Sequence, residues 1–391
     1  MHVLKVHNFY QQPGGEDQSF AAEIALLERY GHRVTRYTIH NDTINGMRRL
    51  SLASKTIWNN VVYRELRTLI RREQPDLVHF ENTFPLISPA AYYAARHEGL
   101  PVVQSLRNYR LFCANGSFLR AGHVCEDCLN KAIPLPALIN CCYRNSRTAT
   151  AVVVALQVTH RVIGTWQRAV DCFIALTEFG RRTFITGGLP ADKILVKPNF
   201  VAVDPGRGPG AGGYALFVGR LSEEKGIARM LAAWKRVGTR MPLKIVGDGP
   251  LGPQVAAATV TQPAIEWLGR RSPAQVTEIM QNATVLIFPS IWYEGFPRVI
   301  VEAYAAGLPV ISSNLGSMTE LIMHRRTGLL VATDDDSDLA TQVLWAVDHP
   351  DELAAMRVFA RAAFEASYTP EQNYVQMMQI YTNCIKQRML V

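Results

Sequence analysis

The sequence predicts an α/β protein made of two Rossmann-like domains, each built on a parallel sheet. Short apolar runs that have the pattern of strands recur in both halves, with helix-length segments between them, and this is the pattern of repeated βαβ units. A stretch rich in glycine and proline, 200–213, interrupts the pattern and is typical of a linker. The chain of 391 residues also exceeds one ordinary hydrophobic core, so two domains are expected.

The first half, residues 1–200, is expected to form the first sheet and its helices. Apolar residues at helical spacing predict two long helices, Asp17–Tyr30 and Thr56–Arg72. The expected strands are Val3–Phe9, Arg33–Ile39, Leu77–Phe80, Val102–Leu106 and Cys172–Leu176.

The second half, residues 201–370, repeats this alternation. The closing segment, 371–391, carries Tyr374, Met378, Tyr381 and Ile385 at helical spacing, which predicts a terminal helix. The expected strands of the second half are Tyr214–Val218, Leu243–Val246, Ile265–Leu268, Val285–Phe288, Val310–Ser312 and Gly328–Val331.

Two glutamates, Glu294 and Glu302, stand seven residues apart after a predicted buried strand. A helix is expected over Pro297–Ala306, with the proline in its first turn, where it has no N–H to satisfy. Glu294 then lies in the loop at the carboxyl end of a strand, where open parallel sheets bind ligands. Two carboxylates entering such a crevice suit a polyhydroxylated ligand. The alternative is a carboxylate at a helix N-terminus plus a solvated helix charge.

Two cations, Arg220 and Lys225, follow another predicted strand and precede the predicted helix Ile227–Val237. The N-terminal end of a helix is already positive, so an anion is expected there to offset the repulsion. Surface side chains with mobile charged ends are the alternative interpretation.

Two adjacent glycines, Gly14 and Gly15, lie between the first strand and the first helix. Glycines at this position let backbone N–H groups approach a diphosphate at a helix N-terminus. A tight turn with nothing bound remains the alternative, and the lack of a full G-x-G-x-x-G argues against a dinucleotide site.

Several segments together resemble one enzyme family. Pro-Ser-x-x-x-Glu-Gly-Phe-Pro, the second glutamate and Ala-Gly-Leu-Pro-Val-Ile resemble the donor-site signature of family 4 of the retaining, nucleotide-sugar-dependent glycosyltransferases. HNFYQQPGGEDQSF resembles the family's glycine loop, and FVGRLSEEKG its diphosphate-binding segment. PDLVHFENTFPLISPAAYYAAR and VVQSLRNYRLFCANGSFLRAGHVCEDCL resemble its bacterial surface-polysaccharide branch. The resemblance implies the GT-B fold, in which two Rossmann-like domains face across a cleft. It implies an acceptor-side domain (1–200), a nucleotide-sugar domain (201–370) and a terminal helix (371–391) that packs back towards the first domain.

The resemblance also implies roles for individual residues. Glu302 would hold the ribose of the donor, and Glu294 the sugar that is transferred. Arg220 and Lys225 would bind the diphosphate and stabilise it as it leaves, so that no catalytic metal is expected. The implied donor-binding residues are Gly14, Gly15, Arg220, Lys225, Gly269, Arg270, Glu294, Gly295, Phe296, Pro297 and Glu302.

The implied reaction moves a sugar, with retention at its anomeric carbon, from a nucleotide-diphosphate donor to a lipid-linked glycan. The leaving diphosphate would help to deprotonate the acceptor on the same face. Such a step belongs to the synthesis of capsule, exopolysaccharide or O-antigen. Two other functions are weighed: a non-catalytic GT-B module that binds nucleotide sugars or glycans, and a nucleotide-sugar epimerase.

Two positions depart from the family's pattern. Glu81 and Arg107 stand where many relatives carry histidine. The second position usually lies near the transferred sugar, but arginine is permanently charged and does not act as a base. Arg107 is therefore interpreted as a catalytic charge stabiliser or anion binder, with a structural ion pair to Glu81 as the alternative and the base left unassigned.

Five of the seven cysteines cluster between Cys113 and Cys142. Disulfides are not expected in a cytoplasmic chain. Cys113, Cys125, Cys128 and Cys141 include one C-x-x-C pair and are compatible with a structural zinc site. Buried or free thiols, and redox chemistry, are the other interpretations.

The net charge of +8 and the pI near 9.2 indicate an anionic partner. No nucleic-acid-binding motif is found, so nucleic acid is not expected as a partner. The sequence begins without a signal peptide and has no bilayer-spanning run, which predicts a cytoplasmic protein. The stripe Val152, Leu156, Thr159, Ile163 and Trp166 is interpreted as core or, alternatively, as a helix that meets the inner face of an anionic membrane.

Overall fold

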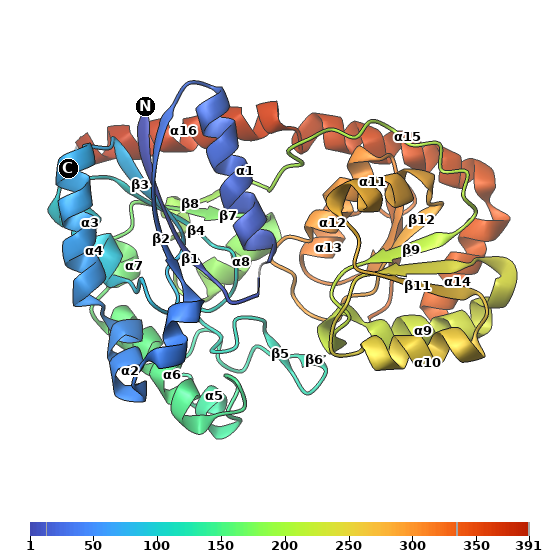
Figure 1. The fold of residues 1–391 in the computed structure, drawn as a ribbon, viewed down its shortest axis with the longest axis horizontal. Helices are drawn as coiled ribbons and strands as arrows, with labels where there is room; N and C mark the ends of the chain where they lie inside the picture. The colour runs from blue at the N-terminus through green and yellow to red at the C-terminus, as the bar shows by residue number, and fades with distance from the viewer. Residues whose placement is uncertain (13, 334, 390–391) are drawn as a thin grey trace. The chain divides into compact units, whose positions relative to one another are not determined.

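The computed structural model describes residues 1–12, 14–333 and 335–389, and it divides into two compact units (Figure 1). Unit 1 comprises Met1–Phe118, Cys125–Asn199 and Asn373–Val391. Unit 2 comprises Leu119–Val124 and Phe200–Gln372. Pro13, part of the predicted glycine loop, lies outside the described residues. The α/β fold class with two parallel sheets is confirmed, because each unit contains one six-stranded parallel sheet.

The sheet of unit 1 has the order β2-β1-β3-β4-β7-β8, and all of its pairings are parallel. The last of these strands was not predicted, because it has three residues and one of them, Leu195, is exposed. The strands are β1 (His2–Phe9), β2 (Arg33–His40), β3 (Leu77–Asn82), β4 (Val102–Ser105), β7 (Cys172–Ala175) and β8 (Ile194–Val196). A two-stranded antiparallel hairpin, β5 (Leu119–Arg120) and β6 (His123–Val124), belongs to unit 2.

The helices of unit 1 differ from prediction at one place. The helix predicted over Thr56–Arg72 is two helices, because the chain is extended at Trp58 and Asn59. The side chain of Asn59 accepts hydrogen bonds from the N–H groups of Val61 and Val62 and thus starts a new helix. The helices are α1 (Gly15–Arg29), α2 (Arg49–Ile57), α3 (Asn60–Glu73), α4 (Ala90–His97), α5 (Leu135–Ile139), α6 (Arg147–Val162), α7 (Thr165–Arg168), α8 (Glu178–Thr186) and α16 (Pro370–Met389).

The terminal helix α16 belongs to unit 1 from Asn373 onward. Tyr374 Oη lies 2.8 Å from His32 Nε2, and Tyr381 Oη lies 2.6 Å from His79 Nδ1. Asn373 accepts a hydrogen bond of 3.1 Å from Lys197. Helix α16 is thus held to residues of β3, the segment after α1 and the segment after β8.

The sheet of unit 2 has the order β11-β10-β9-β12-β13-β14 and is also entirely parallel. One face of the sheet packs on α9, α10 and α14 in a single apolar core. The strands are β9 (Ala215–Val218), β10 (Leu243–Val246), β11 (Ile265–Gly269), β12 (Val285–Phe288), β13 (Val310–Ser313) and β14 (Gly328–Val331). The helices are α9 (Ile227–Val237), α10 (Gly252–Thr261), α11 (Pro273–Asn282), α12 (Arg298–Ala305), α13 (Ser317–Leu321), α14 (Asp336–Asp348) and α15 (Pro350–Ser367).

The segment 200–213, predicted as a linker, packs onto unit 2. The N–H groups of Gly208, Gly210 and Gly212 donate to the carbonyl oxygens of Ala306, Gln281 and Asn282. A Cβ atom on Gly208 would lie 2.2 Å from the carbonyl oxygen of Gln281. The glycines therefore permit close packing here, which composition alone does not distinguish from flexibility.

Every helix in the described part of the chain is too short or too polar to cross a lipid bilayer.

Candidate functional site

The predicted donor residues of unit 2 lie at the carboxyl ends of three of its strands. Strands β9 and β12 are neighbours, and the strand order runs outward from them in opposite directions. The loop after β9 carries Arg220 and Lys225, and the loop after β12 carries Glu294. Open parallel sheets bind ligands outside the strand carboxyl ends at this reversal of strand order. The topology therefore brings the two segments together where a ligand is expected.

Glu294 is a buried carboxylate, 6% exposed, that neighbouring groups hold in place. Its Oε1 accepts hydrogen bonds from Lys225 Nζ at 2.6 Å and from Ser290 Oγ at 2.7 Å. Ser317 Oγ donates to its backbone carbonyl oxygen at 2.8 Å. An ionised carboxylate at this depth needs such partners, because burial of an unpaired charge is costly. Ser290 and Ser317 were not given roles from the sequence. Ser317 lies on α13, and no motif links it to Glu294.

The loops after β9 and β12 touch at a glycine. Gly226 has φ +71°, and a Cβ atom on it would lie 2.0 Å from the carbonyl oxygen of Pro289. Glycine is therefore required at the start of α9, and its small size lets Lys225 reach Glu294. Lys225 Nζ also lies 5.7 Å from the ring centroid of Trp292, a distance at which the aromatic ring attracts the cation.

Arg220 differs from Lys225 in its surroundings. It is exposed, and within the described residues no ion pair or side-chain hydrogen bond engages its guanidinium. Its side chain is available to an anion.

Glu302 lies on α12, with its side chain one-third exposed. Arg298 NH2 approaches its Oε1 at 3.6 Å. Burial raises the pKa of the Glu302 carboxyl, and Arg298 opposes that rise. The helix begins at Arg298 and not at Pro297, because Pro297 has an extended ψ of 90° and precedes the helix as its cap. Phe296 is buried, with its ring 6.2 Å from that of Tyr368, and Gly295 is partly exposed.

Gly269 is the last residue of β11, and Arg270 follows it at the same sheet edge. The carbonyl oxygen of Gly269 accepts a hydrogen bond of 2.9 Å from Gly247, which follows β10. Arg270 is largely exposed, and its Nε lies 3.4 Å from Asp248 Oδ2. These residues extend the polar edge away from the Lys225–Glu294 pair by two strands.

The glycine loop of unit 1 lies at a second reversal of strand order, after β1, which lies between β2 and β3. Gly14 and Gly15 are exposed, and a Cβ atom on Gly14 would meet nothing within 4 Å. Gly14 N donates to Asp17 Oδ2 at 2.9 Å, and Asp17 Oδ1 lies 2.8 Å from His7 Nε2. The loop is thus anchored on its protein side and open on the other.

Glu16, not chosen from the sequence, links this loop to the segment after β4. Its Oε1 accepts a hydrogen bond of 3.0 Å from Asn108 Nδ2. Burial raises the pKa of the Glu16 carboxyl. Its position beside the glycine pair was the sequence signal for it.

Arg107, predicted as a charge stabiliser or anion binder, is enclosed by other protein groups. Its side chain is 2% exposed, and its Nε donates to Glu81 Oε2 at 2.8 Å. The remaining nitrogens contact Glu23 and Asn199. The structural ion pair with Glu81, stated as the alternative, is the arrangement found. Glu81 and Arg107, the two departures from the family's pattern, are buried side by side, so the charge of each neutralises that of the other.

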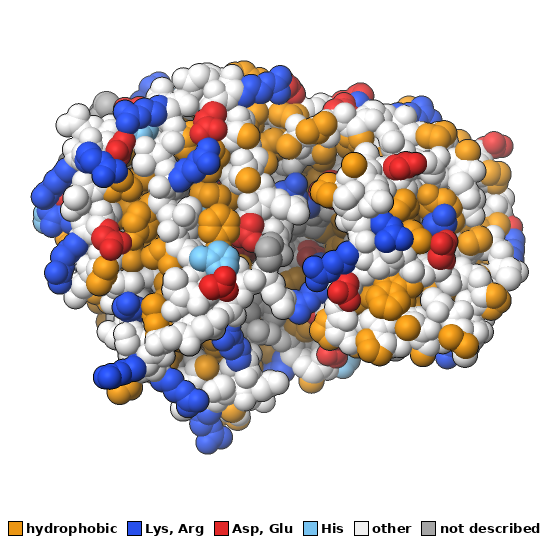
Figure 2. Space-filling view, in the orientation of Figure 1, with side chains coloured by type: hydrophobic (Ala, Val, Ile, Leu, Met, Phe, Trp, Pro, Cys, Tyr) orange, Lys and Arg blue, Asp and Glu red, His pale blue; other side chains and the backbone are white. Residues whose placement is uncertain are grey.

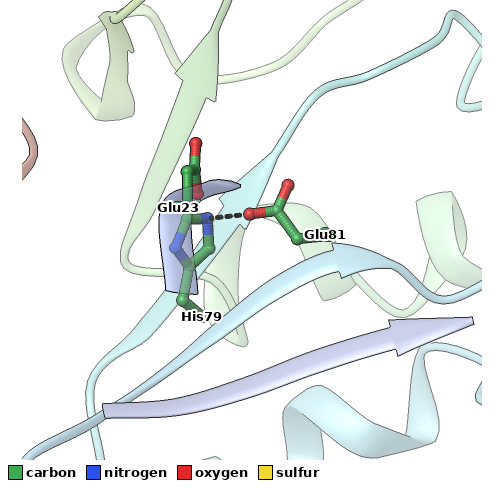
Figure 3. A group of neighbouring side chains, drawn as sticks. All are labelled: Glu23, His79 and Glu81. Atoms are coloured by element: carbon green, nitrogen blue, oxygen red, sulfur yellow. Dashed lines mark ion pairs between the residues drawn. The ribbon is translucent and has the colours of Figure 1, made fainter. Parts of the chain in front are cut away.

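Glu23, His79 and Glu81 form the neighbouring part of this network, and their side chains point toward one another (Figure 3). Their ligand atoms lie within 4.8 Å of one another, as in a metal site. Lys5 Nζ, however, lies 2.8 Å from Glu23 Oε2 and 3.0 Å from His79 Nδ1, and it also contacts Glu81. The ammonium group of Lys5 thus fills the position that a metal ion would take.

The four predicted zinc ligands, Cys113, Cys125, Cys128 and Cys141, are free thiols. Among the described residues, no three of the thiols lie within 4.8 Å of one another. Cys141 has φ +49°, and its Sγ points to the carbonyl oxygen of Leu138 at 3.8 Å. Burial raises the pKa of the Cys128 thiol to about 11, and the charges of Cys113, Cys142 and Cys125 contribute to the rise.

The predicted stripe from Val152 to Trp166 is not one exposed face. Helix α6 ends at Val162, and Gly164 turns the chain into α7. Trp166 is 4% exposed, and its ring packs edge-on against that of Tyr92. Trp166 belongs to the core of unit 1.

Two family models match the chain. The model "Glycosyl transferase 4-like domain" matches residues 14–199, and "Glycosyl transferases group 1" matches residues 212–349. Together they span almost all of both sheets.

Curated relatives match over part of their length. A glycogen synthase of Mycobacterium tuberculosis is 34% identical over 171 residues, which cover 42% of this chain and 39% of that protein. A phosphatidyl-myo-inositol mannosyltransferase of Mycobacterium leprae is 31% identical over 245 residues, 60% of this chain and 65% of that protein. The chain therefore spans about two fifths of the first of these relatives and less than two thirds of the second.

A solved structure shares the fold over nearly the whole chain. The Anabaena protein HepE, crystallised with UDP and glucose, superposes with a TM-score of 0.70 at 17% identity, covering 98% of this chain and all of that one. At this identity the likeness shows the fold alone.

Proposed function

This chain belongs to the glycosyltransferases of the GT-B fold, and from that premise we propose that it transfers a sugar from a nucleotide-diphosphate donor to a glycan. The observation that carries the proposal is the contact between the loops after β9 and β12. It joins a buried carboxylate, Glu294, to a cation, Lys225, beside the exposed Arg220. A sugar diphosphate needs hydrogen-bond acceptors for its hydroxyls and cations for its phosphates, and both are present here.

The residues divide the donor between them. Arg220 and Lys225 bind the diphosphate, and Glu294 with the backbone of Gly295 to Pro297 binds the transferred sugar. Glu302 accepts hydrogen bonds from the ribose. Gly269 and Arg270 bind the nucleobase. Gly14 and Gly15, considered on unit 1 alone, are exposed and could offer backbone N–H groups to a phosphate.

The reaction proceeds with retention at the anomeric carbon. The bond between this carbon and the diphosphate oxygen breaks, and a bond to the acceptor hydroxyl oxygen forms on the same face. The acceptor proton passes to the departing diphosphate. Fixed cations stabilise the negative charge that develops on the leaving group, and Arg220 and Lys225 supply them without a catalytic metal.

The acceptor is a lipid-linked glycan of a surface polysaccharide. The mannosyltransferase relative supports a lipid acceptor, since its name gives a phosphatidylinositol as its substrate. The charge of +8 suits phosphorylated lipid headgroups.

A panel of nucleotide sugars tests the proposal, with thermal unfolding and release of nucleotide diphosphate as readouts. UDP-glucose is the first donor to include, because a structural neighbour was solved with UDP and glucose. We expect one or two donors to raise the unfolding temperature and to release their diphosphate. If donors bind but are not turned over with any acceptor, the chain is a binding module. If the configuration of one carbon of the bound sugar is inverted while the sugar stays on its nucleotide, the chain is an epimerase.

A further inference from the structure

We propose that one end of unit 1, formed by α2, α5 and α6, docks onto an anionic phospholipid membrane. This surface, named here the acid-free surface, is formed by the exposed side chains of residues 43–64 and 129–170. The membrane contact itself does not depend on the proposed function. Only its purpose, to bring the enzyme to a lipid-linked acceptor, rests on that function.

The charge of the acid-free surface is entirely positive. The chain contains 33 aspartates and glutamates, yet segments 43–64 and 129–170 contain none. Their basic residues are Arg48, Arg49, Lys55, Arg64, Lys131, Arg144, Arg147, Arg161 and Arg168. Figure 2 shows Lys and Arg side chains over the end of unit 1 where α2, α5 and α6 lie in Figure 1. A long one-signed region without acidic partners is adapted to an anionic surface and not to internal ion pairs.

The two segments form one surface because their helices pack together. His160 Nε2 of α6 lies 2.9 Å from the carbonyl oxygen of Ile57, the last residue of α2. Ala137 of α5 packs in one apolar cluster with Val153 and Val154 of α6. Helix α5 thus has one face on α6 and the opposite face free.

The free face of α5 is apolar. Leu135 and Ile139, one helical turn apart, are 55% and 73% exposed, and Ile133 just before the helix is 53% exposed. At the end of α6, Val162 is 79% exposed. Lys131 precedes α5, and exposed Arg144 and Arg147 follow it.

This combination favours a membrane over other anionic partners. Aliphatic side chains flanked by lysine and arginine insert at the boundary between headgroups and acyl chains, while the cations meet the lipid phosphates. Nucleic acid is bound through basic and aromatic groups, and aliphatic residues add little there. The occupant that fits both the apolar and the basic residues is an anionic bilayer.

Co-sedimentation with vesicles tests the proposal, with the full chain and no donor sugar present. Vesicles of phosphatidylglycerol and phosphatidylcholine are compared with pure phosphatidylcholine at low and high salt. We expect binding to the anionic vesicles only, weakened at high salt as the Debye length shortens. The double variant Arg144→Gln and Arg147→Gln should lower the affinity for anionic vesicles roughly fivefold per charge removed. The double variant Leu135→Gln and Ile139→Gln should remove the vesicle binding that remains at high salt.

Matched controls lie on unit 2, where Val260 is 85% exposed and Lys235 and Arg236 are exposed on α9. Val260→Gln and Lys235→Gln with Arg236→Gln should bind vesicles as the wild type does. Equal binding to neutral and anionic vesicles overturns the proposal, as does an equal loss in the controls. Two further outcomes would assign the surface to another partner and overturn the proposal. One is tighter binding of a single-stranded oligonucleotide through the same residues. The other is self-association that Ile139→Gln abolishes without a change in vesicle binding. If the protein binds anionic vesicles but transfers no sugar, the proposed function is refuted. The docking proposal then still stands, because vesicle binding tests it separately.

Discussion

Lys225 Nζ lies 2.6 Å from Glu294 Oε1, and this ion pair joins the loop after β9 to the loop after β12. Glu294 is almost fully buried, whereas the Lys225 side chain is 20% exposed. The cation thus offsets the burial of the carboxylate and still reaches solvent, where a diphosphate can approach it. The ion pair aligns both groups before any donor binds.

Removal of the Lys225 charge should slow transfer far more than it weakens donor binding. We expect Lys225→Met to lower kcat by about a hundredfold to a thousandfold, the usual effect of losing a group that stabilises developing negative charge. Transfer by the wild type should persist in a chelator such as EDTA. Restoration by magnesium or manganese of an activity lost in EDTA would contradict the assignment of the leaving-group charge to Arg220 and Lys225. Lys225→Arg serves as the control that keeps the charge.

Arg107 should act on stability and not on donor affinity. Arg107→Ala leaves Glu81 and Glu23 with fewer cationic partners in a buried site, so the free energy of unfolding should fall by about 3–5 kcal/mol. Denaturant titration measures the loss, and calorimetry at a temperature where the variant is folded measures nucleotide binding. A large loss of nucleotide affinity in a folded variant would restore Arg107 as a ligand-binding residue.

His79 should make the protein less stable as the pH falls. Burial, and then the charge of Lys5, lower the pKa of His79 to about 3, whereas an unfolded chain has a histidine pKa near 6.5. Between about pH 6.5 and 3 the unfolded chain therefore binds a proton that the folded chain does not. The free energy of unfolding then falls with decreasing pH, by up to about 1.4 kcal/mol per pH unit from this group.

Urea titrations between pH 7 and 5 measure this slope. His79→Gln should flatten it relative to the wild type, although Glu23 and Glu81 also lose their charges in stronger acid. His123 is exposed, so His123→Gln should leave the slope unchanged. An identical slope in wild type and His79→Gln would contradict the lowered pKa, because His79 would then bind its proton over the same pH range in the folded and the unfolded protein.

Cysteines 113, 125, 128 and 142 should bind one structural zinc ion if the thiols close around it. This prediction replaces Cys141 by Cys142, because Cys142 packs against the apolar cluster that contains Cys128, whereas the Cys141 thiol points to the carbonyl oxygen of Leu138. Metal analysis of the purified protein should find about one zinc per chain, which Cys128→Ser removes and Cys141→Ser leaves. Zinc-free protein of unchanged stability would identify the cluster as ordinary thiols.

The sheets were predictable because strand signals are local. Runs such as Val285–Phe288 are buried on both faces and so consist of apolar residues throughout. The break at Asn59 was missed because apolar spacing continues through it, and only its side-chain cap interrupts the helix. Gly208 was also misread from the sequence alone. Its small size lets the chain pack against the carbonyl group of Gln281, which is more than seventy residues away in the sequence.

The site was predictable only where a motif fixed the spacing. Glu294 lies in the loop after β12, and Lys225 and Arg220 lie in the loop after β9, so topology brings them to one edge. The buried positions of Arg107 and Trp166 depend on contacts with Glu81 and Tyr92, which no local sequence pattern indicates. Ser317 and Lys5 were missed for the same reason.

The division of labour between Glu294 and Glu302 tests the central claim most directly. Isothermal titration of Glu294→Ala and Glu302→Ala with a nucleotide diphosphate, and then turnover with the matching nucleotide sugar, separates the two carboxylates. We expect Glu302→Ala to weaken binding of the free nucleotide by about tenfold to a hundredfold, since a hydrogen bond to a charged group contributes about 1.5–3 kcal/mol. Glu294→Ala should bind the nucleotide nearly as the wild type does and lose most of its turnover. Equal loss of nucleotide affinity in both variants, or full turnover by Glu294→Ala, would contradict the account.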